Sequence, residues 1–273
     1  HNDDSGSVDE QAYIKKLTSD VRVVSIVHTS PVTGMTVDLE KITKEVRNVT
    51  PDCIIIVDGI QHSSHGAIDV QKYDIDGYVV SPYKMFSRHG YGVAWASERL
   101  CSLNKEQLAD GPFQNWELGT RDAGSYATFS DVVDYLDWLG SNFTESENTR
   151  ERLEASSIAI KSHEQELVDL VINGAEDIVG LRNNKKIRII GNSASTSREG
   201  VVSFFHKNKP SSIIVEELRQ RKIRVHIRKD DHYCGNILRP LNQKDCIRFS
   251  ICHYNSKAEV VEFMKAMNEI SAN

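Results

Sequence analysis

Two side chains with complementary chemistry come directly after apolar strands. Asp58 closes the apolar run 53–57, and Lys84 follows Val79-Val80-Ser81-Pro82-Tyr83. In open α/β sheets ligands sit beyond the carboxyl ends of the strands, so we expect both residues at one crevice. A desolvated lysine is a nucleophile that forms a Schiff base with a carbonyl group, and a carboxylate near it requires a positive partner or hydrogen bonds. The pair predicts a site for a carbonyl cofactor.

Each of these residues also has an ordinary structural interpretation. Asp58 can cap a helix or end a solvated turn. Lys84 can lie along the surface with its charged end in water, which is the commoner fate of a single lysine. Taken alone, the two positions leave both interpretations open.

The elements that must position this site follow from the apolar pattern. Residues 21–27 are apolar and β-branched, 38–49 have helical spacing, and 53–57 are apolar on consecutive positions. A strand that is apolar on both faces is typical of a parallel sheet covered by helices. The first half therefore belongs to the α/β class, with further strands expected at 77–80 and 92–96.

The second half of the chain changes pattern. Apolar spacing predicts a helix over 125–139 with Gly140 as its C-cap, then a polar joint over 141–150 and a long amphipathic helix over 150–171 that bridges two domains. Alternating short strands and helices beyond it indicate a small α+β domain. The expected strands are 187–190, 201–205, 223–227 and 247–252, and the expected helices are 211–219 and 257–271.

With these elements in place, four motifs resemble the class V group of fold-type I pyridoxal-phosphate enzymes, which includes aminotransferases and cysteine desulfurases. Val57-Asp58-Gly59-Ile60-Gln61-His62 is similar to the family's cofactor motif, and Ser81-Pro82-Tyr83-Lys84 is similar to its Schiff-base motif. Gly90-Tyr91-Gly92-Val93 fits its glycine-rich hairpin, and Trp116-Glu117-Leu118-Gly119-Thr120 fits the loop whose threonine reaches the partner subunit's phosphate.

The resemblance implies a pyridoxal 5'-phosphate cofactor and a role for each matching residue. Asp58 would keep the ring nitrogen protonated, so that the ring acts as an electron sink, and Gln61 would bind the ring hydroxyl. Ser81 would bind the phosphate, and Lys84 would hold the aldehyde and then move protons on the substrate. Tyr83 is also expected at the cofactor, but desulfurases usually have histidine there, and this departure disfavours the desulfurase subtype.

The small domain adds two residues by the same resemblance. Asp245-Cys246-Ile247-Arg248-Phe249-Ser250 is similar to a late strand whose arginine clamps the substrate carboxylate, and Arg248 is the expected anchor. A domain-interface salt bridge is its structural alternative. Cys234, in Asp231-His232-Tyr233-Cys234-Gly235, falls where some desulfurases carry their persulfide-forming cysteine. A small buried cysteine is the alternative, and the sequence leaves both open.

Departures from the family pattern also have consequences. Pro31 falls where related enzymes often place an asparagine near the ring, so one cofactor contact is expected to be missing. His28 lies at a strand end, where a core role is favoured over a contact with the ring. Family members carry a further N-terminal portion with a glycine-rich phosphate turn, and nothing similar precedes Val21. The sequence is therefore expected to be a fragment of a longer enzyme.

Composition narrows the class of partner. The chain has 33 basic and 39 acidic side chains, a net charge of -6, and no Lys/Arg block, which argues against nucleic acid and anionic membranes as general partners. No stretch approaches the roughly 20 apolar residues of a spanning helix, and the polar start is not a secretory signal. The 5 cysteines are scattered without a CxxC pair, which favours reduced thiols, no zinc and a cytoplasmic location.

The sequence thus predicts an incomplete, mostly parallel large domain with flanking helices plus a small C-terminal α+β domain. The expected limits are 1–20 for a polar segment, 21–145 for the large domain and 146–273 for the linker helix and small domain. The function that the resemblance implies is a homodimeric pyridoxal-phosphate enzyme that acts on an amino acid, and a cysteine desulfurase with a sulfur-acceptor protein is one form of it. The alternative is an inactive relative that serves as a dimerisation or binding module. A nicotinamide enzyme is disfavoured because no GxGxxG follows a predicted strand.

Overall fold

The computed structural model describes residues 5–272 except 112–114, 117 and 121. Contacts divide the chain into two compact units. The N-proximal unit consists of Lys16–His28 and Asp38–Ile158, and the C-proximal unit consists of the chain up to Lys15, Thr29–Val37 and Ala159 onward. The domain limits expected from the sequence stay a prediction, but by contacts residues 29–37 group with the C-terminal half.

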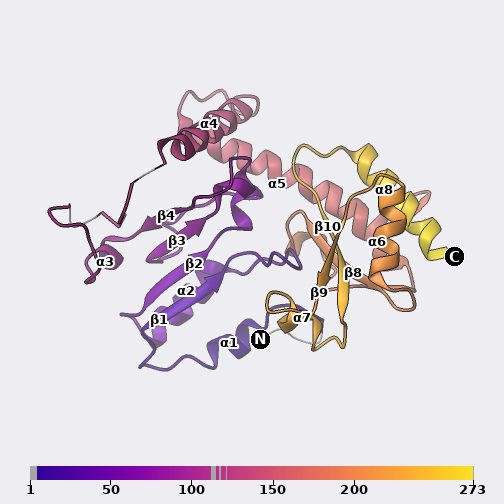
Figure 1. The fold of residues 1–273 in the computed structure, drawn as a ribbon, viewed down its shortest axis with the longest axis horizontal. Helices are drawn as coiled ribbons and strands as arrows, with labels where there is room; N and C mark the ends of the chain where they lie inside the picture. The colour runs from indigo at the N-terminus through magenta and orange to yellow at the C-terminus, as the bar shows by residue number, and fades with distance from the viewer. Residues whose placement is uncertain (1–4, 112–114, 117, 121, 273) are drawn as a thin grey trace. The chain divides into compact units, whose positions relative to one another are not determined.

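The N-proximal unit is built on a sheet in the order β1-β2-β3-β4 (Figure 1). β1 (Val23–Val27), β2 (Ile54–Asp58) and β3 (Gly77–Val80) are parallel, as predicted, and β4 (Val93–Ala96) is antiparallel to β3. The carboxyl ends of the three parallel strands therefore meet at one edge of the sheet, where the expected cofactor residues follow.

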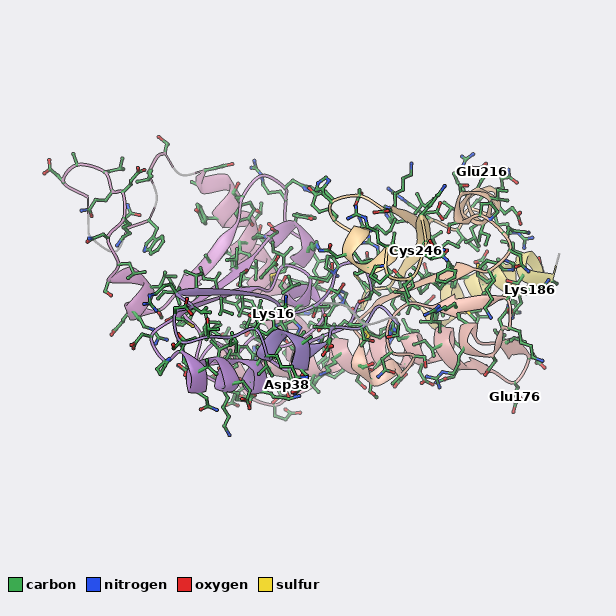
Figure 2. The ribbon with its side chains drawn as sticks, turned by 90° about the horizontal axis from the view of Figure 1, so that it is seen from below. Lys16, Asp38, Glu176, Lys186, Glu216 and Cys246 are labelled. Atoms are coloured by element: carbon green, nitrogen blue, oxygen red, sulfur yellow. The ribbon has the colours of Figure 1, made fainter. Side chains whose placement is uncertain are left out.

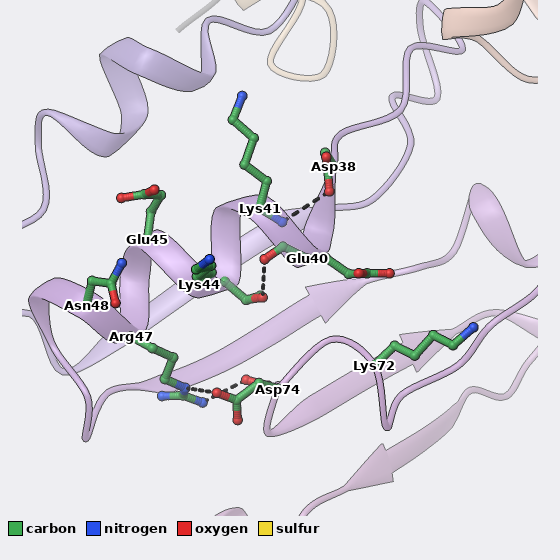
Figure 3. A pocket seen from close by; sticks show the side chains of 10 residues that line it. Asp38, Glu40, Lys41, Lys44, Glu45, Arg47, Asn48, Lys72 and Asp74 are labelled. Carbon is green, nitrogen blue, oxygen red and sulfur yellow. Dashed lines mark hydrogen bonds and ion pairs between the residues drawn. The ribbon is translucent and has the colours of Figure 1, made fainter.

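One face of this sheet is covered by α2 (Leu39–Val49), which lies against the strands in Figures 1 and 3. The α2 side chains Leu39, Ile42 and Val46 are buried, because the 3.6-residue repeat places them on one side of the helix. The sequence predicted a sheet covered by helices on both faces, and the other face differs from this prediction. Val23 and Val27 of β1 are 61% and 46% exposed, so the described chain leaves part of that face open.

The remaining elements of this unit are short helices and turns that follow the strands, and two longer helices, of which α5 continues into the second unit. They are η1 (His62–Ser64), η2 (Pro82–Met85), α3 (Glu98–Cys101), α4 (Ala123–Gly140) and the first part of α5 (Thr149–Asn173).

The expected C-cap role of Gly140 is wrong. Gly140 is the last residue of α4, the cap is Ser141, and Gly140 does not have the left-handed backbone of a glycine cap. A Cβ at Gly140 would lie 1.9 Å from the carbonyl oxygen of Arg152. Glycine is required there because the backbones of α4 and α5 approach closely.

The opposite end of the sheet from the carboxyl ends is tied together by Asp76, which is fully buried just before β3. Its carboxylate accepts hydrogen bonds from Arg47 (2.9 Å), Arg99 (2.6 Å), Ser97 (3.0 Å) and the backbone N–H of Ile55 (2.8 Å). Burial alone would raise the pKa of Asp76, but these hydrogen bonds together lower it, so the carboxylate stays ionised.

The C-proximal unit is built on an antiparallel sheet in the order β7-β8-β10-β9. Its strands are β7 (Ile187–Ile189), β8 (Val201–His206), β10 (Asp245–Ser250) and β9 (His226–Lys229). The expected strand at 223–227 is displaced, because pairing with β10 begins only at His226. The main apolar core, which includes Phe204 and Phe263, lies between the sheet and the helices. These helices are the later part of α5, α6 (Ser211–Gln220) and α8 (Lys257–Ala272).

A second apolar cluster lies on the other face of this sheet. It contains Val32, Phe205, Cys234 and Cys246 together with residues of α7 (Gly235–Leu238). The short elements that complete this unit are α1 (Glu10–Ile14), β5 (Gly174–Ala175), β6 (Ile178–Val179), η3 (Leu181–Asn183) and η4 (Ser195–Ser197).

The segment Thr29–Val37, which we call the strap, leaves β1 and is fastened to the C-proximal sheet. Three successive carbonyl groups of the strap accept hydrogen bonds from side chains of this unit. The donor and acceptor pairs are Arg248 with Pro31, Ser203 with Val32, and Arg198 with Thr33. Within the described part of the chain, no helix is long and apolar enough to cross a membrane.

Candidate active site

Asp58 is the last residue of β2 and lies between Val27 of β1 and Val79 of β3 in the strand register. Its carboxylate accepts a hydrogen bond from the backbone N–H of Ile60 (3.0 Å), and its carbonyl oxygen accepts one from the N–H of His28 (2.9 Å). The side chain is half-buried. The turn that follows β2 therefore fixes the carboxylate at the edge of the sheet without an ion pair of the kind that holds Asp76.

Lys84 reaches the same edge from the next strand. Ser81 follows β3, Pro82 begins the turn η2, and the hydroxyl of Ser81 makes no capping hydrogen bond. The Nζ of Lys84 donates a hydrogen bond of 2.8 Å to Oε1 of Gln61. This bond joins the turn after β3 to the turn after β2, so the structure brings Lys84, Gln61 and Asp58 together at one edge.

The floor beneath this edge is made of aromatic side chains. A Cβ at Gly59 would lie 2.0 Å from Cε1 of Tyr78, so only glycine lets the turn cross that ring. The hydroxyl of Tyr78 is 2.9 Å from Nδ1 of His28, which is buried and stacks on His62 with ring centroids 3.7 Å apart. The favoured core role of His28 is what the structure shows.

A second histidine of the turn contacts Gln61 and was not found from the sequence. Nε2 of the buried His65 lies 3.0 Å from Nε2 of Gln61. The position of His65, four residues after Gln61 in a turn that follows an apolar strand, was the only available signal.

Tyr83 and His89 form a stacked pair at the exposed rim of the site. Their ring centroids are 4.3 Å apart with an interplanar angle of 17°, and Tyr83 is 41% exposed. His89 directly precedes the glycine-rich hairpin Gly90–Val93, and no sequence pattern singled it out. The hairpin is fastened to α4, because the Ser87 hydroxyl is within 2.6 Å of the Tyr91 hydroxyl and 2.9 Å of the Thr128 hydroxyl.

The loop expected to reach a partner subunit is described only in part. Thr120 and Trp116 are exposed, whereas Glu117 of the same motif lies outside the described residues. The nearby ion pair between Arg88 and Asp122 (3.0 Å) joins the hairpin to the residue that caps α4. An exposed Thr120 is compatible with the expected contact, which stays a prediction.

Arg248 lies in the C-proximal unit, on β10, opposite Ser203 of β8 and His226 of β9. The side chain is half-buried, and its Nη1 donates a hydrogen bond of 2.9 Å to the carbonyl oxygen of Pro31. The strap thus holds one arm of the guanidinium. Pro31, which has no polar side chain to offer a cofactor, accepts this bond through its backbone carbonyl.

Cys234 has the opposite character from a reactive thiol. It is 1% exposed within the second apolar cluster. Burial is the largest effect on the Cys234 thiol and raises its pKa above the ordinary value, despite the lowering by Arg228, so the thiol is protonated at neutral pH. Burial likewise raises the pKa of Cys246, labelled on β10 in Figure 2, to about 12. Reactive cysteines are exposed and have lowered pKa values, so these observations favour the structural interpretation.

A charged groove lies between α2 and the loop before β3 that carries Lys72 and Asp74 (Figure 3). It is lined by four acidic and four basic side chains, and Arg47 pairs there with Asp74 at 3.3 Å. The balanced charge favours neither an anion nor a cation. Among the described residues, no group of three His, Cys, Asp or Glu side chains is placed to hold a metal ion.

Comparison with known proteins decides the family. The model of the family described as Aminotransferase class-V matches residues 1–263. The chain belongs to this family.

Two curated class V relatives are similar over nearly the whole chain. The identity is 27% with the aminotransferase-like protein FGM3 of Gibberella zeae, over 93% of this chain and 60% of that protein. It is 23% with a probable cysteine desulfurase of Treponema pallidum, over 98% of this chain and 63% of that protein. The chain therefore spans about three fifths of the length of these relatives.

The fold of this class V chain matches solved structures. The apo structure of a cysteine desulfurase from Thermococcus onnurineus NA1 superposes with a TM-score of 0.79 at 21% identity, covering 100% of this chain and 65% of that one. The cysteine desulfurase CsdA of Escherichia coli gives 0.72 at 21% identity. These likenesses confirm the expected fold class, a fold-type I large domain with a small C-terminal α+β domain.

Class V enzymes use pyridoxal 5'-phosphate, and the residues at the strand ends fit that cofactor. A carboxylate at Asp58 suits the protonated pyridine nitrogen, the amide of Gln61 suits the ring hydroxyl, and the amine of Lys84 suits the aldehyde. The Ser81 hydroxyl, which makes no capping hydrogen bond, suits the phosphate. All four side chains belong to one compact unit, so the fit does not depend on how the two units are arranged.

Proposed function

We propose that this chain provides the Schiff-base half of a pyridoxal-phosphate enzyme that acts on an amino acid. The hydrogen bond from Lys84 to Gln61 carries this proposal, because it places the amine at the strand end that also holds Asp58. The alternative, a class V relative without catalysis, is not favoured by any contact at this edge. An inactive relative has no need to keep an amine, an amide and a carboxylate within one pair of turns.

The roles of the side chains follow from their chemistry. The bound cofactor would supply an electron sink for charge that develops on the substrate. Asp58 would hold a proton on the ring nitrogen, Ser81 would donate to a phosphate oxygen, and Tyr83, stacked on His89, would flank the cofactor. Lys84 would first hold the aldehyde and, once the substrate amine displaces it, would give and take the proton on the substrate's α-carbon.

Arg248 is the proposed anchor for the substrate carboxylate. Its guanidinium offers five N–H donors in a planar fork that matches a carboxylate, and the bond from Nη1 to the carbonyl of Pro31 holds the side chain in one orientation. A carboxylate is a stronger acceptor than a peptide carbonyl, so a substrate would compete well for this arginine. Arg248→Lys should therefore raise KM for the amino acid more than it lowers kcat.

Cysteine desulfurase activity is the second candidate, favoured by the similarity to the cysteine desulfurases of Treponema pallidum and Thermococcus onnurineus NA1. That chemistry converts cysteine to alanine and leaves sulfur on an enzyme thiol, from which an acceptor protein would take it. The burial of Cys234 argues that sulfur does not pass through this residue in the described arrangement. Cysteine turnover to alanine and sulfide that is lost in Cys234→Ser would overturn that assignment.

A homodimer is part of the same proposal. The exposed Thr120 would complete the phosphate site of the neighbouring subunit, as the family resemblance implies. Sedimentation of the full-length protein with and without cofactor measures whether the dimer forms.

The decisive experiment is a visible spectrum of the full-length protein with pyridoxal 5'-phosphate. The wild type should show the visible band of a protein-bound Schiff base, and Lys84→Ala should lose it. Lys72→Ala is the matched control, because Lys72 is an exposed lysine of the same unit that pairs with Asp69 at 3.7 Å. A wild-type protein without a visible band, or a band that survives in Lys84→Ala, would contradict the proposal.

A further inference from the structure

The amide of Gln61 is held on both sides, and this determines which atom faces which neighbour. A lysine ammonium only donates hydrogen bonds, so the atom 2.8 Å from Lys84 must be the amide oxygen of Gln61. The amide nitrogen then faces Nε2 of His65 at 3.0 Å. An amide nitrogen only donates, so Nε2 of His65 is the acceptor.

The acceptor role fixes the protonation state of His65. A neutral imidazole has one acceptor nitrogen, so the ring proton of His65 must be on Nδ1. The ring is 3% exposed, and the backbone N–H of His65 donates to the carbonyl of His62 at 2.8 Å, which fixes the turn. His65 is thus a rigid, buried acceptor beside the amide.

One N–H of the Gln61 amide is used by neither Lys84 nor His65. The amide has two N–H donors and one oxygen; the oxygen is taken by Lys84 and one N–H by His65. We propose that His65 is a positioning residue, which orients the Gln61 amide so that its oxygen faces Lys84 and its second N–H faces the ring oxygen of the cofactor. This inference rests on the proposed function.

The effect of removing His65 follows from the softness of the amide torsion. The terminal torsion of glutamine is broad and nearly two-fold, so an amide without its acceptor can present oxygen instead of nitrogen to the ring oxygen. One hydrogen bond to the cofactor is then lost. The expected change is an increase in the cofactor's dissociation constant of about fivefold. The pH midpoint of the visible band should also rise, because the ring oxygen holds negative charge less well without its donor.

His65→Phe tests the proposal, with two matched variants. His65→Gln offers an amide oxygen as the acceptor and should restore both the affinity and the midpoint. His206→Phe removes a buried imidazole at the end of β8 in the C-proximal unit, whose Nδ1 accepts hydrogen bonds from the backbone N–H groups of Asn208 (3.1 Å) and Lys209 (2.9 Å), and should leave the midpoint unchanged. If His65→Phe retains the wild-type midpoint, or if His206→Phe shifts it equally, His65 has no positioning role.

A measurement on the unmodified apoprotein decides the case if His65→Phe does not fold. Nitrogen NMR of the histidine rings distinguishes the two neutral tautomers. The inference requires His65 to be neutral with its proton on Nδ1, and a proton on Nε2 at neutral pH overturns it. This readout needs no cofactor, so a missing visible band would defeat the proposed function without deciding this test, and the Nε2 tautomer would defeat the inference alone.

Discussion

At the residue scale, Asp58 and Asp76 show how neighbours decide the chemistry of a side chain. Both are aspartates at the ends of adjacent strands. Asp76 is fully buried and saturated by Arg47, Arg99 and other donors, which makes it a structural anion. Asp58 is half-buried and accepts a backbone hydrogen bond from Ile60. It is therefore the carboxylate that is suited to hold a ligand.

Gly59→Ala should destabilise the site turn. The new Cβ would lie 2.0 Å from the Tyr78 ring, and the hydrogen bond between Tyr78 and His28 holds that ring in place. We expect the free energy of unfolding to fall by about 1–3 kcal/mol, as for other overpacked sites. Urea denaturation of the wild type and Gly59→Ala measures this difference in the free energy of unfolding.

Gly119→Ala is the control, because a Cβ there has nothing within 4 Å. Its effect should stay within about 0.5 kcal/mol. Equal stability of the two variants would show that the turn moves freely away from Tyr78. In a Tyr78→Ala background the cost of Gly59→Ala should largely disappear.

At the element scale, the carboxylate of Asp76 joins four elements that are otherwise separate in sequence. Its donors come from α2, β2 and the start of α3, and it immediately precedes β3. The N-terminal end of the sheet is therefore fixed by charge-assisted hydrogen bonds. The carboxyl-terminal end is left to the turns that carry Gln61 and Lys84.

Asp76→Asn should cost about 3 kcal/mol at neutral pH, because it leaves the side chains of Arg47 and Arg99 without their buried counter-ion. The pKa of Asp76 in the folded protein is below its unfolded value of 3.8. Its stabilising contribution is therefore complete above pH 3.8 and is lost as the pH falls through the lower, folded value.

Urea denaturation of wild type and Asp76→Asn between pH 7 and pH 3 measures this contribution. The difference between the two proteins should be constant at higher pH and shrink toward the acid end. A difference that stays the same at the lowest pH would contradict the assignment of an ionised, hydrogen-bonded Asp76.

At the scale of the whole molecule, the chain passes repeatedly between its two units. The strap Thr29–Val37 separates β1 from α2 in sequence, yet it belongs by contacts to the C-proximal unit. Arg198 is its buried fastener. The guanidinium is 3% exposed and donates to the carbonyls of Thr33 (2.9 Å), Ile190 (3.2 Å) and Asn192, and burial lowers its pKa to about 10.

Arg198→Ala should release the strap. Three carbonyl groups, two of them on the buried residues Thr33 and Ile190, would lose their donor. We therefore expect a loss of about 3–5 kcal/mol in stability and faster amide exchange in residues 29–37 than in β1. Hydrogen exchange read by mass spectrometry measures both segments. Arg221→Ala, which removes an exposed ion pair with Glu269, is the control and should change stability by less than about 1 kcal/mol. Unchanged exchange in the strap would show that Arg198 does not fasten it.

The parallel strands, their order along the chain and the residues that follow them could be predicted from the amino-acid sequence. Apolar runs and the motifs around Asp58 and Lys84 are local signals, because a strand and the turn after it are written in consecutive residues. The covalent order alone places both residues at carboxyl ends of neighbouring strands. The same local signals predicted α2 and α8 nearly to their observed ends.

The burial and the hydrogen-bond partners of these side chains became known only from the three-dimensional structure. The contact of His65 with Gln61, the burial of Cys234 and the fastening of the strap by Arg198 depend on which segments pack together. Gly140 shows the same limit. A glycine at a helix end predicts a C-cap, whereas the close approach of the α5 backbone to Gly140 depends on tertiary packing. Burial and hydrogen-bond partners are set by residues distant in sequence, and these fix whether a thiol reacts and which way an amide points.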